Sequence, residues 1–424
     1  MLTEALRRMI AHKGDRYAFE PYKTGDIDFS SLPEEIGLYI HIPFCRRLCP
    51  FCPYNKTLYN SNLAARYYRA LLKELELYRP FLGGKHINSI YLGGGTPTLM
   101  MGEIALFLEK LRNEAGFQGD VGIEVHPREA TPENLAAARN AGINLVSVGV
   151  QSFHGPSLSF LERGYGPEES HQGVINALKA GFETVDVDLM YNIPGQSQED
   201  MEKDLETCLS YGVEQVSIYP LIIFPLTPLH NKIKSTGVNR FSELAEYKIQ
   251  RKLERVAERY GYQRTSIWTF GKKGVKRYTS VTRETFLGLG ASATSLYNRY
   301  FYLNTFDVEA YIKALDSGTM PISLVNYMNE REKQVFWLFW RCYDTEIPRR
   351  RFSHLFRASL DRNFPLLTAG LKLLGLAKDQ GEVLKLTPRG TFCFHFIEKQ
   401  YSLRYLNNLW DVSMQNSWPK RLEL

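Results

Sequence analysis

The sequence predicts an α/β protein built on a partial (β/α) barrel, and three observations lead to this class. Short apolar strand patterns alternate with helical stretches of about 10 to 17 residues, an order typical of βαβ units and a parallel sheet. Six such units are legible between residues 37 and 225, against eight in a full barrel. Polar or glycine residues follow the strands, which places candidate functional groups on one rim.

The six predicted strands are separated by helical patterns that begin with residues 62–78. The strands are residues 37–42, 89–95, 121–127, 144–153, 184–195 and 215–221. The handedness rule for parallel strands makes each connection between them right-handed. An open doubly wound sheet is the alternative arrangement of the same elements.

Composition and charge limit the classes of function. Of the 424 residues, 44% are hydrophobic and the formal net charge is +6, which is mild for a nucleic-acid-binding protein of this length. No apolar run reaches the roughly 18 residues of a membrane span, and the N-terminus lacks the apolar core of a secretory signal. We therefore expect a cytoplasmic monomer that binds neither nucleic acid nor membranes.

Three of the six cysteines lie in one short segment, residues 41–56, "HIPFCRRLCPFCPYNK". Cys45, Cys49 and Cys52 have the spacing C-x3-C-x2-C. No fourth ligand for zinc is evident nearby, whereas thiolates hold iron–sulfur clusters. Three thiolates on a four-iron cluster leave one iron open to a small molecule. Elsewhere we expect buried structural thiols at Cys208, Cys342 and Cys393.

Polar motifs follow the strands after the cysteine loop. The glycines of "GGGTPT" (93–98) lack Cβ atoms, so their backbone can approach a ligand closely. Glu124 ends the third strand, Gln151 the fourth and Asp188 the fifth. We interpret Asp188 as the inward carboxylate of its strand and Asp186 as the outward one.

These motifs resemble the radical S-adenosylmethionine (SAM) superfamily. More narrowly, they resemble its branch of oxygen-independent coproporphyrinogen III oxidase-like (HemN-like) enzymes, which includes class C methyltransferases and cyclopropanases. The cysteine spacing with an aromatic residue, Phe51, before the third cysteine is the superfamily signature. "YIHIPFC", "LGGGTPT", "IEVHPRE", "VGVQSF" and "DLMYNIPGQ" extend the resemblance over residues 37–225, and "FLGLGASATS" continues it more weakly.

The resemblance implies a [4Fe–4S] cluster on Cys45, Cys49 and Cys52, with SAM chelating the open iron. Reduction of the cluster would cleave SAM to a 5′-deoxyadenosyl radical, with a flavodoxin- or ferredoxin-type protein as electron donor. The family's cofactor-binding positions correspond to Tyr39, Phe51, Gly94, Gly95, Thr96, Glu124, Gln151, Arg163, Asp188 and Ile222. Among the side chains, the Arg163 guanidinium could bind a carboxylate as a fork.

The resemblance also divides the chain into three parts. Residues 1–36 form an N-terminal extension, and residues 37–295 form the barrel with its accessory segment. Residues 296–424 form a smaller, mainly helical domain of winged-helix type. We interpret the basic run of residues 349–351 as a solvated helix face, although such runs also occur in nucleic-acid sites.

One position departs from the decarboxylating oxidases, which carry a further cysteine two residues after the third cluster cysteine. Tyr54 stands there, while Asn55 and Lys56 keep the oxidase-like pattern. We therefore expect methyl or methylene transfer to an sp² carbon of an aromatic or heteroaromatic small molecule, using a second SAM. Tyr54 and Gln151 are the candidate catalytic residues. Oxidative decarboxylation of a tetrapyrrole and heme delivery by a chaperone of the same family are the alternatives.

Overall fold

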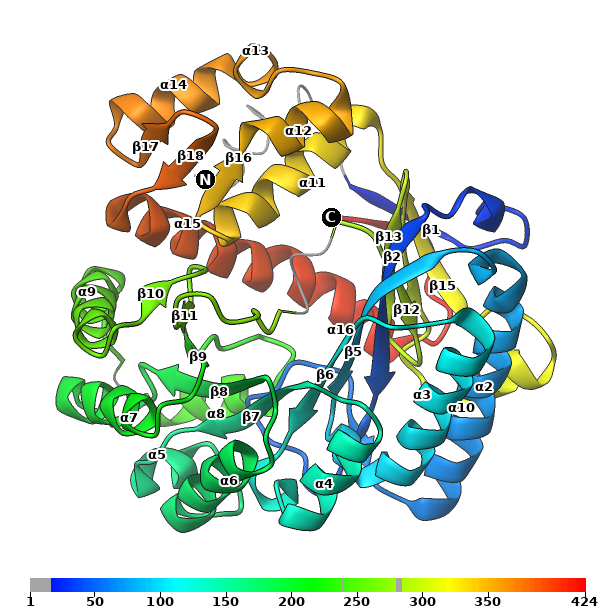
Figure 1. The fold of residues 1–424 in the computed structure, drawn as a ribbon, viewed down its shortest axis with the longest axis horizontal. Coiled ribbons are helices and arrows are strands. Elements are labelled where there is room, and N and C mark those ends of the chain that lie inside the picture. Colours follow the sequence, from blue (N-terminus) through cyan, green and yellow to red (C-terminus); the bar gives the residue numbers. More distant parts are fainter. Residues whose placement is uncertain (1–16, 238–239, 280–283) are drawn as a thin grey trace.

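The computed structural model describes residues 17–237, 240–279 and 284–424, and its centre is a curved sheet of parallel strands (Figure 1). These strands are β2 (Glu35–Ile42), β5 (His86–Gly94), β6 (Asp120–Val125), β7 (Leu145–Gln151), β8 (Thr184–Tyr191) and β9 (Gln215–Pro220). They are neighbours in that order, and every pair is parallel. The predicted partial barrel of six units is confirmed.

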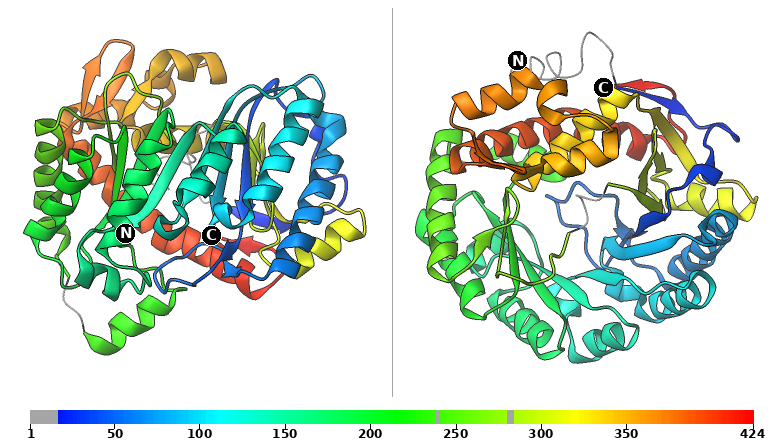
Figure 2. Two further views of the ribbon diagram at one scale, coloured as in Figure 1. Left: turned by 60° about the horizontal axis from the view of Figure 1, so that its bottom comes forward. Right: turned by 45° about the horizontal axis from the view of Figure 1, so that its top comes forward.

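Helices cover the outer side of the curved sheet (Figures 1 and 2). They are α2 (Ser61–Leu82), α3 (Met101–Ala115), α4 (Pro132–Asn140), α6 (Pro167–Lys179) and α7 (Gln198–Ser210), followed by α9 (Glu243–Arg259). Local sequence sets where several of them begin. Asn60, Thr131 and Ser197 each accept a hydrogen bond from a backbone N–H of the first turn, which satisfies a group that the helix itself leaves unpaired.

Further strands extend both edges of the sheet. On one side lie β12 (Phe286–Leu289), β13 (Thr294–Tyr297), β14 (Tyr300–Asn304), β15 (Ile322–Tyr327), β1 (Ala18–Pro21) and β19 (Leu422–Glu423), and on the other β11 (Thr269–Gly271) and β10 (Gln263–Arg264). The predicted division between residues 295 and 296 therefore falls inside β13. The described part of the N-terminal extension belongs to the same sheet, because β1 pairs with β15.

A second hydrophobic core begins after β15. It is built by α11 (Glu330–Tyr343), β16 (Glu346–Pro348), α12 (Arg349–Phe356), α13 (Leu360–Asn363), α14 (Pro365–Leu373), β17 (Ala377–Gln380), β18 (Val383–Leu386) and α15 (Pro388–Tyr401). The three strands pair in the order β16-β18-β17, beside helices packed around Trp337, Phe352 and Leu384. This order of helices and a small antiparallel sheet is a winged-helix arrangement.

Two of the three arginines at the start of α12 form ion pairs with neighbouring residues. Arg349 donates to Asp361 at 2.9 Å and to Asp379 at 2.8 Å, and Arg351 pairs with Glu284. These ion pairs tie the wing and the preceding segment to α12. No helix among residues 17–237, 240–279 and 284–424 is both long and apolar enough to cross a membrane.

The last helical segment returns from the second core to the barrel. After α15 the chain passes through a π-helical turn, η4 (Ser402–Leu406), into α16 (Asn407–Gln415), which crosses the open side of the barrel (Figure 1). The Asn407 side chain accepts a hydrogen bond from the Leu226 backbone N–H at 3.0 Å. The segment thus contacts the loop that follows β9.

Candidate active site

The cysteine loop follows β2 and is closed by a short pair of parallel strands, β3 (Phe44–Cys45) and β4 (Thr57–Leu58). The Tyr59 N–H donates to the Cys45 carbonyl at 2.9 Å, and the Cys52 N–H donates to the Cys49 carbonyl at 3.3 Å. Cys49 is buried, and Cys45 and Cys52 are half-buried. The three thiols are therefore held in one closed and largely shielded loop.

The donor set of this loop fits an iron–sulfur cluster. Among the described residues, no three His, Cys, Asp or Glu side chains meet closely enough to bind a single metal ion. Each thiolate of a [4Fe–4S] cluster binds a different iron, so cluster ligands need not meet at one point. Burial and the neighbouring Cys52 raise the pKa of Cys45 to about 11. A thiol with such a raised pKa ionises readily only beside a strong positive charge. Bound iron would supply that charge.

Arg163 ties the cysteine loop to the end of β7. It donates to the Cys49 sulfur at 3.3 Å, to the Gly149 carbonyl at 2.8 Å and to the Tyr165 hydroxyl at 3.0 Å. Burial opposes its charge, but Tyr165 and Cys49 outweigh that effect and raise the pKa of Arg163. Its guanidinium also lies 5.9 Å from the Phe51 ring centroid. The structure thus brings the predicted residues Arg163 and Phe51 together at the cysteine loop.

The glycine segment after β5 has no room for side chains. Gly94 has φ +113°, and a Cβ there would lie 2.6 Å from the His41 ring. A Cβ on Gly95 would lie 2.6 Å from the Phe44 carbonyl oxygen. Thr96 follows, and its backbone N–H donates to that same carbonyl at 2.7 Å. The segment therefore lies directly against the cysteine loop, while its predicted close approach to a ligand stays a prediction.

Glu124, at the end of β6, is fixed beside these glycines. Its carboxylate accepts from the Gly94 N–H at 3.0 Å and from the Tyr91 hydroxyl at 3.1 Å. Burial raises the pKa of Glu124 to about 7, although both hydrogen bonds act in the opposite direction. A cationic ligand placed here would favour the ionised form and would be bound more tightly by it.

The interpretation of Asp186 as an outward residue is wrong. The Ser147 hydroxyl lies 3.0 Å from an Asp186 oxygen and 3.2 Å from an Asp188 oxygen, so both carboxylates lie on one face of β8. Alternation in a strand requires this, since residues two apart point the same way. Burial raises the pKa of Asp186 to about 6 and that of Asp188 well above its ordinary value. The two acids share one polar site with Glu124, whose charge raises the pKa of Asp188 further.

Gln151 and Tyr39 complete the strand ends. Gln151 is buried at the end of β7 with φ +68°, a conformation that a residue other than glycine adopts at some energetic cost. Its side-chain oxygen accepts from the Tyr219 hydroxyl at 3.1 Å. The Tyr39 hydroxyl lies 2.9 Å from His41 Nδ1, and His41 Nε2 lies 3.0 Å from the Asn55 carbonyl oxygen. His41 thus links Tyr39 to the cysteine loop.

Tyr54 lies where the cysteine loop meets α16. It is 55% exposed, and its ring centroid lies 5.6 Å from that of Trp410. Trp410 stacks on Phe224 at 5.9 Å with 24° between the rings. Ile222, two residues before Phe224, is half-buried. We name the rings of Tyr54, Trp410 and Phe224 the aromatic cluster. Phe224 belongs to the apolar segment 222–227, whereas no sequence motif marks Trp410.

The electrostatic surroundings of Tyr54 are acidic. Burial raises its pKa above the ordinary value, and charges on Glu124, Cys52, Asp188 and Glu398 raise it further. Glu398 comes from α15, so the second core also contributes charge to this region.

The remaining cysteines lie elsewhere. Cys208 is buried in α7, as predicted, whereas Cys342 and Cys393 are only half-buried. Cys342 lies in α11 and Cys393 in α15, and these amphipathic helices of the second core leave part of each thiol uncovered.

Comparison with known proteins agrees with this geometry. Residues 39–208 match the family model of the radical SAM superfamily. The chain is 26% identical over 360 residues to the heme chaperone HemW of Bacillus subtilis, which covers 83% of this chain and 95% of that protein. It is 27% identical over 307 residues to the oxygen-independent coproporphyrinogen III oxidase of Cereibacter sphaeroides, covering 68% of each.

A solved structure shares most of the fold. Coproporphyrinogen III oxidase (HemN) of Escherichia coli superposes with a TM-score of 0.76, covering 89% of this chain and 92% of that chain at 23% identity. The cysteine loop and the glycine segment lie within residues 39–208, the part of the chain that matches the radical SAM superfamily. The chain is thus similar to HemN-like proteins, and the superfamily whose model it matches implies a [4Fe–4S] cluster and SAM as cofactors.

Proposed function

We propose that this protein transfers a methyl or methylene group from a second SAM to an sp² carbon of an aromatic or heteroaromatic small molecule. The observation that carries the proposal is Tyr54, which stands where the decarboxylating oxidases have a cysteine. It lies in the aromatic cluster and among acidic charges.

The residues at the strand ends would bind and orient the first SAM. When bound, the cluster supplies the electron that converts SAM into a radical able to abstract hydrogen. Glu124 and the backbone of Gly94 would hold the amino end, and Asp188 would accept from a hydroxyl of the ligand. Arg163 would keep Cys49 and the end of β7 in fixed relative positions. Gln151, hydrogen-bonded to Tyr219, would orient polar groups of the ligand.

The aromatic cluster and the carboxyl groups near it favour a planar aromatic substrate. A planar ring gains from offset or edge contacts with Tyr54 and Trp410, worth about 0.5–1.5 kcal/mol per ring pair beyond area burial. Glu124 and Asp188 near Tyr54 favour a cationic sulfonium, because a cation stabilises the ionised form of carboxyl groups whose pKa burial raises. A tetrapyrrole with several carboxylates would need cationic partners, and Arg163 and Lys56 are already engaged by the cysteine loop.

Product analysis tests this function. Reconstituted and reduced protein should convert SAM carrying a deuterated methyl group into both S-adenosylhomocysteine and 5′-deoxyadenosine when given its aromatic substrate. Label should appear in that substrate. Carbon dioxide and protoporphyrinogen formed from coproporphyrinogen III above background would overturn the proposal in favour of the oxidase.

A heme chaperone is the second candidate, and the match along 95% of HemW favours it. In that case the aromatic cluster would receive heme instead of a substrate. Heme titration separates the two functions. Stoichiometric heme binding that survives gel filtration, without consumption of SAM under reducing conditions, would favour the chaperone.

A further inference from the structure

Glu398 in α15 carries a buried hydrogen-bond acceptor that nothing in the described part of the chain satisfies. The residue is only 8% exposed. The Ser402 hydroxyl donates to Oε1 at 2.8 Å, whereas Oε2 has no hydrogen-bond partner. Among the described residues it is the one carboxylate oxygen that is buried in this state. Buried polar atoms are almost always paired in folded proteins, so this oxygen indicates a partner that the chain itself does not supply.

Glu398 lies on the face of α15 that meets the barrel. His395, one turn earlier on that helix, accepts a hydrogen bond from the Trp268 indole N–H at 2.8 Å. Trp268 meets Tyr343 edge to face, with 5.8 Å between the ring centroids. The charge of Glu398 raises the pKa of Tyr343 and also that of Tyr54. The carboxyl is therefore within electrostatic range of the inner side of the cysteine loop, where α15 leads into α16 across the open barrel (Figure 1).

The basic residue next to Glu398 in the chain is engaged elsewhere. Lys399 pairs with Glu246 of α9 at 2.6 Å, and Glu246 also accepts from Asn192 at 2.6 Å. Burial raises the pKa of Glu398 to about 7, although the Ser402 hydrogen bond and the Lys399 charge oppose this effect. A positively charged donor beside Oε2 would favour the ionised carboxylate and would in turn be bound by it.

The turn that follows Glu398 adds a second polar atom of the same kind. Residues 402–406 form a π-helical turn, a distortion of helices that is frequent at functional sites. The hydroxyl of Tyr405, inside this turn, is also buried without a hydrogen-bond partner among the described residues. A hydroxyl can both donate and accept. Two polar atoms without partners thus lie on the segment that leads from α15 to Trp410.

We propose that Glu398 is a specificity-determining residue that binds a basic nitrogen of the aromatic substrate, such as a protonated amine or amidine. The ring of such a substrate would pack on Tyr54 and Trp410, which contact each other. Its nitrogen would donate to the unpaired carboxylate oxygen, a charge-assisted hydrogen bond. A carboxylate in the same place would be repelled. The inference rests on the proposed function, because it concerns the substrate of the same site.

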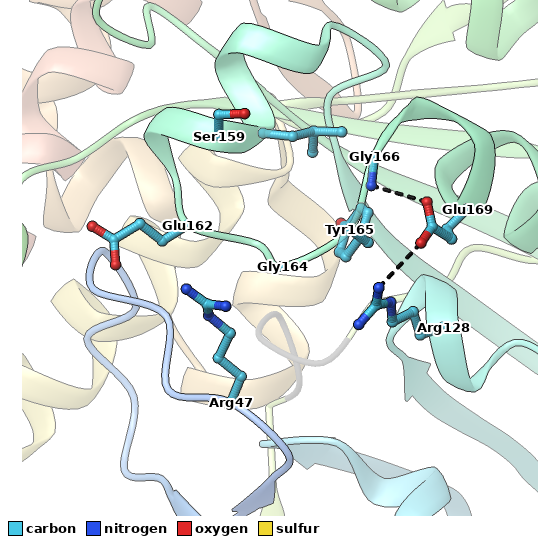
Figure 3. A pocket seen from close by; sticks show the side chains of 9 residues that line it. Arg47, Arg128, Ser159, Glu162, Gly164, Tyr165, Gly166 and Glu169 are labelled. Atoms are coloured by element: carbon cyan, nitrogen blue, oxygen red, sulfur yellow. Dashed lines mark hydrogen bonds and ion pairs between the residues drawn. The ribbon is translucent and has the colours of Figure 1, made fainter.

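The carboxylates in the pocket on the outer side of the cysteine loop are, by contrast, already paired. This pocket has a volume of about 480 Å³ and is bordered by Arg47 and Arg128, which enter it from two different loops (Figure 3). Glu169 on its wall pairs with Arg128 at 3.2 Å, and Glu162 pairs with Lys232 at 2.8 Å. Its mixed charges select no ligand, whereas the single open acceptor on α15 selects a donor.

Three aromatic probes of similar shape and different charge test the proposal. Benzamidine is a cation, benzamide is neutral and benzoate is an anion. Binding to the reconstituted and oxidised protein is measured by saturation-transfer NMR titration. Saturating SAM is present, so that Glu124 and Asp188 are occupied, and without reductant no radical forms. Glu398→Gln removes the charge and keeps the shape of the side chain. Glu382→Gln, an exposed residue of the second core, is the matched control.

Wild-type protein should bind benzamidine at least about tenfold more tightly than benzoate, with benzamide between them. Glu398→Gln should weaken benzamidine binding about tenfold and change benzamide binding by no more than about twofold, and Glu382→Gln should change neither. Iron content and SAM affinity should stay the same in both variants. The comparison of the three probes uses wild-type protein, so it decides the question even where Glu398→Gln does not fold.

Equal affinity of the wild-type protein for the three probes would overturn the proposal. Benzamidine binding that Glu398→Gln leaves unchanged would do the same. So would a loss of SAM affinity in Glu398→Gln that matches the loss for benzamidine, since the carboxylate would then bind the amino group of a cofactor instead of a substrate nitrogen.

Product analysis separates this inference from the proposed function. Methyl transfer is measured by the formation of S-adenosylhomocysteine, whereas benzamidine binding needs neither turnover nor a reductant. If the reduced protein forms no S-adenosylhomocysteine while benzamidine binding depends on Glu398, the proposed function fails and the cation site stands. If S-adenosylhomocysteine forms and benzamidine binds no more tightly than benzoate, the cation site fails and the proposed function stands.

Discussion

The inner and outer sides of the cysteine loop differ in charge and in what they meet. On the inner side, Tyr54 faces aromatic rings and the acidic groups Glu124 and Asp188. On the outer side, Arg46 and Arg47 are exposed, and the second of them borders an open pocket. One loop thus separates a region suited to a planar or cationic ligand from a polar surface of mixed charge. Changes on one side should leave the other side's function intact.

The largest effect is expected from loss of the iron–sulfur cluster, on which both sides of the loop depend. Cys49→Ala deletes a cluster ligand and the acceptor of the Arg163 hydrogen bond. We expect loss of the iron–sulfur absorbance, iron content near background and no SAM cleavage with any reductant. Cys393→Ala, on α15, is the control and should keep full iron loading. A fully loaded Cys49→Ala protein would contradict the assignment of the cluster.

The second largest effect is expected for SAM binding, which depends on the inner side of the loop alone. Glu124→Gln should weaken SAM binding about ten- to a hundredfold, because charge-assisted hydrogen bonds contribute about 1.5–3 kcal/mol. The wild-type affinity should rise with pH through about 7, since the carboxyl has its pKa there and only the ionised form attracts a cation. The variant should lose this pH dependence. Calorimetry across pH measures both effects, with the exposed Glu109→Gln as control.

Trp410→Ala is expected to have an intermediate effect, also on the inner side. Removing the ring that contacts both Tyr54 and Phe224 should lower kcat/KM for the aromatic substrate about two- to tenfold. SAM binding and cluster reduction by dithionite should not change. Trp418→Ala, an exposed tryptophan near the C-terminus, serves as the control. A loss of SAM affinity equal to the loss in kcat/KM would show that Trp410 acts on the cofactor instead.

The smallest effect is expected for Tyr54→Phe, which keeps the ring and deletes the hydroxyl. If Tyr54 acts as an aromatic surface, methyl transfer should fall by no more than about threefold. Tyr54→Leu, which removes the ring as well, should lower methyl transfer further. Tyr54→Cys should not create decarboxylation of coproporphyrinogen, since positioning a propionate needs many contacts. A large loss in Tyr54→Phe would instead give the hydroxyl a chemical role.

The strands and the cluster loop could be predicted because their signals are local. Each strand of the barrel is a short apolar run bounded by a helix pattern, and the cysteines are defined by spacing alone. The glycines beside Glu124 could be singled out from the sequence, but their packing against His41 could not, because it depends on a neighbouring strand. The error at Asp186 was avoidable, because strand alternation already places it on the same side as Asp188.

The contacts that define the inner side could not be predicted in this way. Trp410 reaches Tyr54 across more than three hundred residues of chain, and nothing in its local sequence indicates a partner. The pocket that Arg47 and Gly164 border is equally non-local, since it combines the cysteine loop with a turn more than one hundred residues further along the chain. Strands as short as β19 have too few residues to show an alternating pattern.

The way α16 is held has a practical consequence. Beyond it, β19 pairs with β1 through the registers Ala18 with Glu423 and Phe19 with Leu422, and the Leu424 N–H donates to the Tyr17 carbonyl at 2.9 Å. The helix that carries Trp410 is therefore held at both ends, at Asn407 by the loop after β9 and beyond its C-terminal end by the pairing of residues 422–424 with residues 17–19. Deleting residues 422–424 should thus loosen the contact between Trp410 and Tyr54, although neither residue is changed.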